Sequence, residues 1–546
     1  MEYKDTIFLP KSSFEMRANL PTKEPKILEE WDKEKIFYKL REKSKGREKF
    51  VLHDGPPYAN GHIHMGTALN KILKDVIVRT QQMAGKDSIY VPGWDCHGLP
   101  IEWKIEEGYR KKGKNKDDVP VVQFRQECRE FAEKWIDIQK KEFRRLGVEG
   151  DWADPYLTMS NKAEAQIVRE LGKFLIDESL YKGAKPVLWS VVEKTALADA
   201  EVEYEDHTSN TIYVKFLINT ASDKDLEGAN IVIWTTTPWT IPGNRALAFG
   251  SDLKYSLIEV EKVAEDSLAK VGDKLIFAEE LISTVSEEIG ITTFKNLKTF
   301  NGSNLADCLC EHPFKELGYD FDVSPFHGDF VNLEQGTGIV HIAPGHGDDD
   351  YNLGIKNGVD VVQTVQDDGR YNHHAKGFEN EHIYKVDDKI AEKLKEFSKL
   401  LFKGTLRHSY PHSWRSKAPL IYRNTPQWFI SMEKNKLRDI ALKSIDETVF
   451  YPPQGQRRLR SMIETRPDWC VSRQRVWGVP LPLFVSKETG QPLRDLEVVE
   501  RIANIYEEEG SDTWFTEDPQ RFLGEKYNLE DYDQVKDVVE VWFDSG

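Results

Sequence analysis

The stretch that decides the fold is Gly55-Pro56-Pro57-Tyr58-Ala59-Asn60-Gly61-His62-Ile63-His64-Met65-Gly66-Thr67. It follows the apolar segment 50–53, which predicts a buried strand, and it precedes apolar residues at helical spacing between Leu69 and Ile77. Strand, glycine-rich loop and helix in this order open a doubly wound α/β unit. The helix N-terminus offers unpaired N–H groups and a partial positive charge, both of which suit a phosphate.

The loop contains the candidate residues for nucleotide binding. His64 can donate a hydrogen bond to phosphoryl oxygens, and Gly66 lets a ligand approach the backbone closely. A capped helix with surface histidines explains the same residues about as well. The segment is not a P-loop, because no Gly-Lys-Ser/Thr follows a glycine. The full candidate set is Asn60, His62, His64, Gly66 and Thr67.

The residue pattern changes twice along the chain. A long amphipathic helix is predicted from about Phe124 to Leu146, with Gly147 as its C-terminal cap. Near residue 186, helical spacing gives way to predicted strands at 211–216, 231–234 and 339–342. We therefore expect an α/β domain that starts in 1–185, a β-rich domain inserted at 186–405, and a return to the α/β domain in 406–546.

Composition limits the class of protein. The chain has 546 residues, 39% hydrophobic and 31% charged, which is typical of globular proteins with more than one domain. No apolar run approaches the roughly 20 residues that span a bilayer, so no membrane partner is expected. Five scattered cysteines favour reduced thiols in a cytoplasmic setting. Because the sequence has no Cys-x-x-Cys pair, we expect no zinc site in it. The net charge of −17 argues against nucleic acid, except near the locally basic arginines between Arg457 and Arg475.

Four blocks of sequence identify a family. They are 55–61, His64-Met65-Gly66-Thr67, Asn70-Lys71-Ile72-Leu73-Lys74-Asp75 and Pro92-Gly93-Trp94-Asp95-Cys96-His97-Gly98-Leu99-Pro100-Ile101-Glu102. Together they closely resemble the isoleucyl branch of the class I aminoacyl-tRNA synthetases. The resemblance implies a Rossmann-like catalytic domain split by an inserted β-rich editing domain. It also implies ATP with Mg²⁺, isoleucine and the tRNA for isoleucine as substrates.

One position departs from the family pattern. The signature usually reads His-Ile-Gly-His, and Thr67 occupies its last place here. A threonine hydroxyl still donates one hydrogen bond to phosphate, but it carries no positive charge. We therefore expect the fold to be kept and the charged clamp at this position to be lost.

The resemblance also assigns the amino-acid pocket. It places Asp95 on the substrate ammonium, Pro56 near the side chain and Trp542 as one wall. An acceptor-only carboxylate and a large rigid indole suit these roles. From residue type alone, Trp542 is more simply a core residue. Trp477 is either structural or directed toward tRNA.

The inserted domain carries residues for a second, hydrolytic site. In a pocket for isoleucine, one missing methylene is worth only about 1–3 kcal/mol, and discrimination against valine by isoleucyl enzymes is the standard example of this limit. By resemblance, Asp350 holds the α-ammonium of a mischarged amino acid, and polar groups around it position water and ribose. Without the resemblance, the residues suggest only a solvated acidic turn and β-propensity. The predicted editing residues are Thr235, Thr236, Thr237, Thr240, Asn244, His341 and Asp350.

The family's second signature, Lys-Met-Ser-Lys-Ser, does not occur before Gly546. We therefore expect the chain to be the N-terminal portion of a longer protein, with part of the activation site beyond it. The rival hypothesis is an editing-only or tRNA-binding module that has no activation activity.

Overall fold

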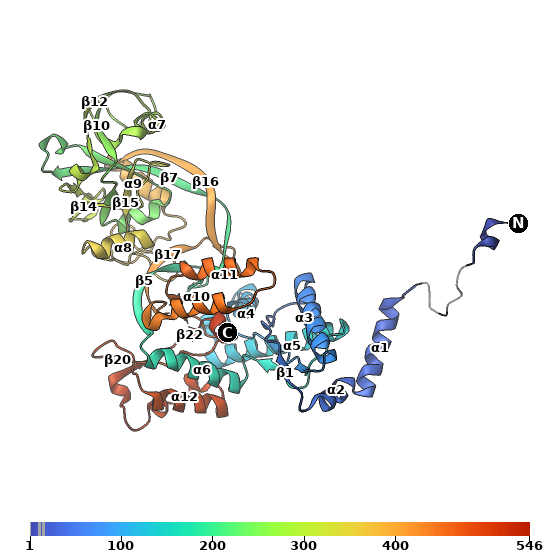
Figure 1. The fold of residues 1–546 in the computed structure, drawn as a ribbon. Helices are drawn as coiled ribbons and strands as arrows, with labels where there is room; N and C mark the ends of the chain where they lie inside the picture. The colour runs from blue at the N-terminus through green and yellow to red at the C-terminus, as the bar shows by residue number, and fades with distance from the viewer. Residues whose placement is uncertain (1, 9–12, 14–16) are drawn as a thin grey trace. The chain divides into compact units, whose positions relative to one another are not determined.

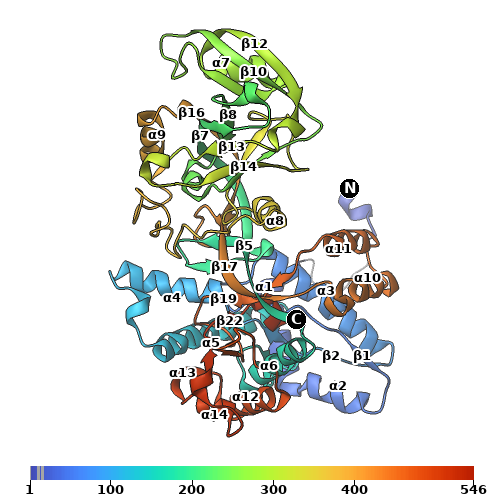
Figure 2. The same cartoon turned by 90° about the vertical axis from the view of Figure 1, so that its left-hand side faces the viewer.

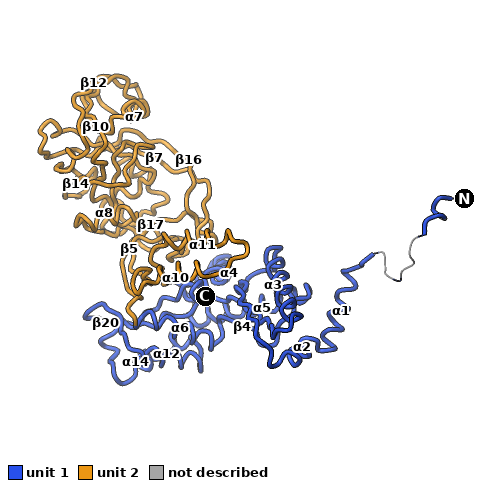
Figure 3. Tube along the Cα trace, in the orientation of Figure 1, with its two compact units in different colours: residues 1–176, 475–546 blue, residues 177–474 orange. Residues whose placement is uncertain are grey.

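The computed structural model describes residues 2–8, 13 and 17–546. The chain forms two compact units, each considered by itself (Figure 3). Unit 1 comprises residues 1–176 and 475–546, and unit 2 comprises residues 177–474. The β-rich domain expected at 186–405 lies wholly inside unit 2. In the described part of the chain, no helix is long and apolar enough to cross a membrane.

Unit 1 begins with the predicted α/β opening. Strand β1 (Lys49–Val51) pairs in parallel with β2 (Asp87–Ile89), and helix α3 (Met65–Met83) connects them. A parallel pair needs such a crossover, so strand, loop and helix form a true βαβ unit. The predictions of a strand before the loop and a helix after it are confirmed. The expected burial of the strand is wrong, because β1 and β2 form a two-stranded sheet in which Val51 is 79% exposed.

The core of unit 1 packs around helix α5 (Val121–Arg145). Phe124, Cys128 and Ala132 on one face of α5 are fully buried, as their helical spacing requires. The helix ends at Arg145 with Leu146 as its C-cap, and Gly147 follows with a φ of +82°, the left-handed conformation that glycine adopts readily. The predicted helix and its glycine stop are thereby confirmed.

The other elements of unit 1 complete this α/β layer and add a helical C-terminal part. Helix α6 packs against α12, and the short β3 pairs in parallel with β4. These elements are α1 (Leu20–Glu34), α2 (Ile36–Ser44), β3 (Gly93–Trp94), α4 (Leu99–Lys111), β4 (Tyr156–Leu157), α6 (Asn161–Ile176), β20 (Phe484–Ser486), α12 (Leu496–Glu509), α13 (Thr513–Thr516), α14 (Gln520–Leu523), β21 (Tyr532–Gln534), β22 (Val538–Val539) and α15 (Val541–Ser545).

Unit 2 is built on a ten-stranded mixed sheet in the order β12-β10-β11-β8-β7-β13-β14-β9-β15, with β16 also paired to β7. Strands β7 (Val202–Thr220) and β16 (Leu400–Ser413) form a long antiparallel ribbon, and they run side by side in both views (Figures 1 and 2). The chain enters the large sheet along β7 and leaves it along β16, so the two connections to the sheet are paired with each other. The predicted strands at 211–216, 231–234 and 339–342 all lie inside observed strands.

A second sheet places the edges of unit 2 outside the range 186–405. Strand β5 (Leu180–Ser190) pairs along its whole length with β17 (Ile421–Ile430), in the order β18-β17-β5-β6. The compact unit therefore starts at Asp177 and continues to Gln474. The remaining elements of unit 2 are β6 (Thr195–Ala196), β8 (Asn230–Thr235), the 3-10 helix η5 (Pro238–Gly243), β9 (Ala246–Phe249), β10 (Lys254–Val263), β11 (Lys274–Ala278), α7 (Ile282–Glu288), β12 (Ile291–Asn301), β13 (Leu309–Glu311), β14 (Asp322–His327), β15 (Ile339–Ile342), α8 (Asp348–Lys356), α9 (Asp387–Glu396), α10 (Leu437–Glu447), α11 (Gln454–Glu464), β18 (Trp469–Cys470) and β19 (Ser472–Arg473).

Candidate functional site

His64 caps helix α3. Its Nδ1 accepts hydrogen bonds from the backbone N–H groups of Gly66 at 3.1 Å and Thr67 at 3.4 Å. Because Nδ1 is an acceptor, the proton of the neutral ring lies on Nε2, and the side chain is exposed. The structure thus combines the two explanations of this motif: the helix is capped, and the imidazole keeps one outward donor.

Gly66 is needed for this cap. A Cβ placed on Gly66 would lie 2.9 Å from Cε1 of the His64 ring and 3.1 Å from its Nδ1. The His64 ring therefore already packs closely against the backbone of Gly66, where we expected a ligand to do so. Thr67 lies in the same turn and is half-buried.

His62 and Asn60 make their hydrogen bonds to other elements. Nδ1 of His62 lies 2.5 Å from Oε1 of Glu142 on α5, and the backbone N–H of Ile63 donates to Oε2 of the same carboxylate at 3.0 Å. The amide of Asn60 donates to the carbonyl of Pro100 at 3.4 Å. These contacts fix the loop against α5 and the first turn of α4.

A buried charge cluster anchors the start of the loop and was not predicted. The carboxylate of Asp54 contacts the ammonium groups of Lys71 and Lys74, and it accepts a hydrogen bond from the Tyr90 hydroxyl at 2.8 Å. Burial lowers the pKa of Lys71 to about 8. Asn70–Asp75 is one of the blocks that carry the resemblance, and the structure assigns two of its lysines to holding the loop.

Asp95 is a buried carboxylate with an unsatisfied oxygen. Its backbone N–H donates to Pro57 at 3.0 Å, and its carbonyl accepts from Ala59 at 2.9 Å, so the nucleotide loop runs beside it. The residue is 7% exposed, and Oδ1 has no hydrogen-bond partner among the described residues. Burial and then the charge of Asp544 raise its pKa well above the usual range, and His97 partly offsets this. A ligand ammonium supplies the countercharge that such a group lacks.

His97 joins three segments around Asp95, and sequence reasoning missed its role. The imidazole is fully buried, with Nδ1 3.0 Å from Asp544 on α15 and Nε2 3.3 Å from Glu164 on α6. Burial alone would lower its pKa, but the hydrogen bonds and charges of Asp544 and Glu164 raise it to about 9. His97 is therefore a cation at neutral pH, in contact with two carboxylates.

The two tryptophans singled out in the sequence differ in placement. Trp477 is fully buried, and its indole N–H donates to the carbonyl of Cys96 at 2.8 Å, so its role is structural. Trp542 on α15 is 50% exposed, which is unlike a core residue. Pro56 is half-buried in the loop. An exposed indole is available as a wall for a ligand, and its assignment to the amino-acid pocket stays a prediction.

In unit 2, the predicted threonines form a hydroxyl cluster at the end of β8. The Thr235 hydroxyl lies 3.1 Å from that of Thr237, which in turn lies 3.4 Å from that of Thr240. Thr240 donates to the carbonyl of Thr237 at 2.8 Å, because the backbone turns into η5 at this point. Thr236, between them, is half-buried. An extended strand would place Thr235 and Thr237 on one face and Thr240 on the other, so the turn into η5 is what brings the Thr240 hydroxyl to the other two.

His341 closes this cluster with a defined proton. Its Nε2 lies 2.8 Å from the Thr240 hydroxyl, and the amide of Asn244 lies 3.3 Å from its Nδ1. The Thr240 proton is directed to a carbonyl and the Asn244 amide is a donor, so His341 donates through Nε2 and accepts at Nδ1. Burial lowers the pKa of His341 to about 4, which keeps it neutral. Oδ1 of Asn244 is buried and has no hydrogen-bond partner in the part of the chain that the structure describes.

Asp350 lies in the first turn of α8, at the end of the connection from β15. It accepts a hydrogen bond from the backbone N–H of Ala343 at 2.7 Å. Among the residues that the structure describes, it makes no hydrogen bond to the threonine cluster. Burial raises its pKa to about 7, as expected for a carboxylate that lacks a cation.

His346 belongs to the same region and was not predicted. Its Nε2 lies 2.8 Å from the Thr364 hydroxyl and its Nδ1 3.1 Å from the carbonyl of Tyr422. The ring contacts Trp239 edge-on at 5.0 Å, and burial lowers its pKa to about 4. The sequence shows a histidine five residues after His341, but only the fold shows that this histidine packs against η5. Over the described ranges, no cluster of three or more His, Cys, Asp or Glu side chains is arranged to hold a metal ion.

Comparison with known proteins assigns the family. A family model described as tRNA synthetases class I (I, L, M and V) matches residues 26–546. The chain is 60% identical to isoleucine–tRNA ligase of Pelagibacter ubique and 51% identical to that of Gluconobacter oxydans, over 100% of this chain in both cases. It spans only 60% and 58% of the length of these two relatives.

Among solved structures, an Agrobacterium radiobacter LeuRS in a ternary complex with tRNA and LeuAMS matches 97% of this chain and 59% of its own, at 16% identity and a TM-score of 0.38. The family assignment rests on the sequence match and agrees with the parallel β1–α3–β2 unit that carries the His64 motif. From the glycine-rich loop to the final helix α15, this chain belongs to the class I tRNA synthetases.

Proposed function

We propose that the protein attaches isoleucine to its tRNA through isoleucyl-adenylate, with ATP and Mg²⁺ entering as substrates. The observation that supports this most directly is Asp95, a buried carboxylate beside the nucleotide loop whose Oδ1 has no hydrogen-bond partner within the described residues. The 60% identity to an isoleucine–tRNA ligase over the whole chain supports isoleucine as the amino acid.

In this proposal, unit 1 acts by positioning and electrostatics. Asp95 holds the α-ammonium, and Pro56 and Trp542 contact the side chain. The substrate carboxylate then attacks the α-phosphorus, and the bond to pyrophosphate breaks. The outward Nε2–H of His64 donates to phosphate oxygens as charge develops, and no covalent bond to the enzyme forms. Thr67 contributes a neutral donor where relatives usually place a second histidine.

We infer a second activity for unit 2: it hydrolyses the ester bond of a tRNA for isoleucine that has been mischarged with valine. Asp350 holds the free α-ammonium, and the hydroxyls of Thr237 and Thr240 position a water. Water adds to the ester carbonyl and the ribose oxygen leaves with a proton. The neutral His341 orients Thr240 and remains uncharged, because its pKa is about 4. Thr235, Thr236 and Asn244 complete the site.

Activation is tested by isoleucine-dependent exchange of pyrophosphate into ATP, using the complete product of the gene. Exchange that depends on isoleucine and disappears in Asp95→Ala supports the proposal. Absence of exchange, together with intact tRNA binding, would favour the rival editing-only or tRNA-binding module.

Hydrolysis is tested on this chain alone, at high protein concentration. The substrate is the tRNA for isoleucine mischarged with valine. We expect weak but measurable deacylation, because the hydroxyl cluster, His341 and Asp350 are all present. Asp350→Ala is the control. Equal background rates for the two proteins would remove Asp350 from the site.

A further inference from the structure

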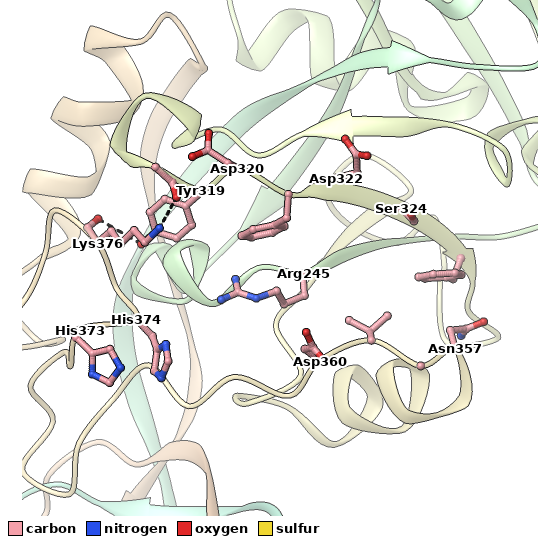
Figure 4. A pocket seen from close by; sticks show the side chains of 15 residues that line it. Arg245, Tyr319, Asp320, Asp322, Ser324, Asn357, Asp360, His373, His374 and Lys376 are labelled. Atoms are coloured by element: carbon pink, nitrogen blue, oxygen red, sulfur yellow. Dashed lines mark hydrogen bonds between the residues drawn. The ribbon is translucent and has the colours of Figure 1, made fainter.

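Unit 2 contains a cavity of about 670 Å³ that none of the predicted editing residues lines (Figure 4). Its walls come from β14, from the segment that follows α8, and from the loop 373–376. This volume is within the range of small-molecule sites, roughly 300–1,000 Å³. The cavity is thus large enough for a ligand and separate from the hydroxyl cluster.

Arg245 projects into the middle of this cavity (Figure 4). Its Nη1 donates to the carbonyl of Asn244 at 2.5 Å, and its guanidinium lies 4.6 Å from the centre of the Phe321 ring. Burial lowers its pKa. Nη1 also donates to the carbonyl of Pro242 at 3.4 Å. In the described part of the chain, no carboxylate forms a salt bridge with Arg245, and Nε and Nη2 of this cavity-lining side chain make no hydrogen bond. A half-buried arginine of this kind is a prepared binding group for a carboxylate.

Acidic side chains lie in the same cavity but do not neutralise Arg245. Asp320, Asp322 and Asp360 are exposed at its rim and, within the described residues, form no salt bridges. The charge of Asp360 is near enough to raise the pKa of Arg245, although the two are not paired. Charges of both signs therefore face one space without contacting each other. Phe321, Phe326 and Val359 supply apolar surface between them.

We propose that this cavity binds a free α-amino acid with an apolar side chain. The ligand carboxylate pairs with Arg245, its ammonium faces Asp360, and its side chain packs against Phe321 and Phe326. Both ionic groups of an α-amino acid are attached to one carbon, so the ligand fits between two charges that are close but unpaired. The lining has three carboxylates and two cations, Arg245 and Lys376, and this negative balance disfavours a polyanion such as RNA.

The site has a direct connection to the hydroxyl cluster. Arg245 contacts the main-chain carbonyl of Asn244, and the side chain of Asn244 contacts His341 at 3.3 Å. A ligand that recruits Arg245 therefore acts next to the residue that fixes the His341 ring. Binding does not depend on the proposed function, but an effect on deacylation does.

The test is calorimetric titration of this chain with valine and isoleucine. All measurements use Asp95→Asn combined with Asp350→Asn, which removes the two other ammonium-binding groups. We expect saturable binding of both amino acids to persist. Arg245→Gln should weaken it by roughly tenfold to hundredfold, as for the loss of a charged hydrogen bond. Asp360→Asn, an exposed change that leaves the fold intact, should weaken it by about tenfold.

Two ligands and one variant serve as controls. 3-Methylbutanoate lacks the ammonium and isobutylamine lacks the carboxylate, so both should bind at least about tenfold more weakly than valine. Asp266→Asn, on the surface of unit 2 outside the cavity, should have no effect. The proposal would be overturned if the double variant bound neither amino acid. It would also be overturned if adding Arg245→Gln or Asp360→Asn left the affinity of the double variant unchanged. Loss of isoleucine-dependent exchange or of deacylation in the unaltered protein would instead count against the proposed function.

Discussion

The imidazole of His97 lies 3.0 Å from the carboxylate of Asp544, although 447 positions separate them in the sequence. Glu164 contacts the other ring nitrogen at 3.3 Å, and all three side chains are fully buried. The contact holds the last helix, α15, beside the segment that contains Asp95. One cationic ring therefore organises the acidic environment around the proposed ammonium site.

We predict that His97→Gln destabilises unit 1 at neutral pH. The folded-state pKa of about 9 lies above the ordinary value of 6.5. The stability that protonation contributes is thus complete below pH 6.5 and is lost as pH rises through 9. The difference in free energy of unfolding between wild type and variant should fall by up to about 3 kcal/mol over this window. Denaturant unfolding at several pH values measures it, and a pH-independent difference would contradict a charged His97.

We predict that Asp95→Asn abolishes isoleucine-dependent pyrophosphate exchange while the fold is kept. The substrate ammonium would lose its countercharge in a buried site, where removing one partner costs about 3–5 kcal/mol. Asparagine fills the same volume and removes the unfavourable buried charge, so thermal stability should hold or rise. Near-normal exchange in this variant would exclude Asp95 from the site.

Gly66→Ala should destabilise unit 1 by about 1 kcal/mol, since the new methyl group displaces the capping ring of His64. Gly108→Ala in α4 is a matched control, because a Cβ there meets nothing within 4 Å and alanine favours a helix. Urea unfolding compares the two variants. Nitrogen-15 NMR of the imidazole should show the proton of His64 on Nε2 in wild type, and a proton on Nδ1 would rule out the cap.

We predict that His346→Gln makes unit 2 less sensitive to acid. The pKa of His346 is lowered from 6.5 to about 4, so the stability of the neutral ring is lost as pH falls through this interval. Removing the group should reduce that loss by up to about 3 kcal/mol. Asp350, whose pKa is raised to about 7, changes stability in the opposite sense, but it is present in both proteins and cancels in the comparison. Parallel acid-unfolding curves for the two proteins would refute the prediction.

Thr67→His should be tolerated. Thr67 is half-buried in the first turn of α3, at the position where the signature that this segment resembles ends in histidine, and a cationic ring near phosphates is favourable. We expect a change in melting temperature of only a few degrees and equal or faster adenylate formation. A large fall in melting temperature would mean that the packing here has been rebuilt around threonine.

Local patterns predicted the elements of this fold better than its long-range contacts. The helix α5 and its stop at Gly147 follow from spacing and a single glycine, and β15 was placed at its observed bounds. The outer part of β7, 202–210, was not predicted, because its charged and polar residues do not alternate. Its partner is β16, about two hundred residues later, and only tertiary structure reveals that pairing.

The candidate sites show the same limit. Asp95, His341 and the threonines were named because they stand inside recognisable motifs. His97 and Asp544 also stand in motifs, but no spacing rule relates residues at opposite ends of a chain. Arg245 was passed over because an arginine beside an asparagine has no special meaning until the cavity around it is known.

The β7–β16 ribbon has a consequence for how such a chain acquires or loses a domain. Val202 pairs with Ser413, so the points where the polypeptide departs and returns are about 5 Å apart. Deleting everything between them leaves two ends that a short turn can join, with no gap to bridge. Chain connectivity therefore does not fix the length of the intervening segment. The flanking sheet nevertheless contacts that segment, since Trp189 donates to the carbonyl of Asp367 and Arg423 donates to that of Val365, so any segment of another length has to supply a surface that covers these two side chains.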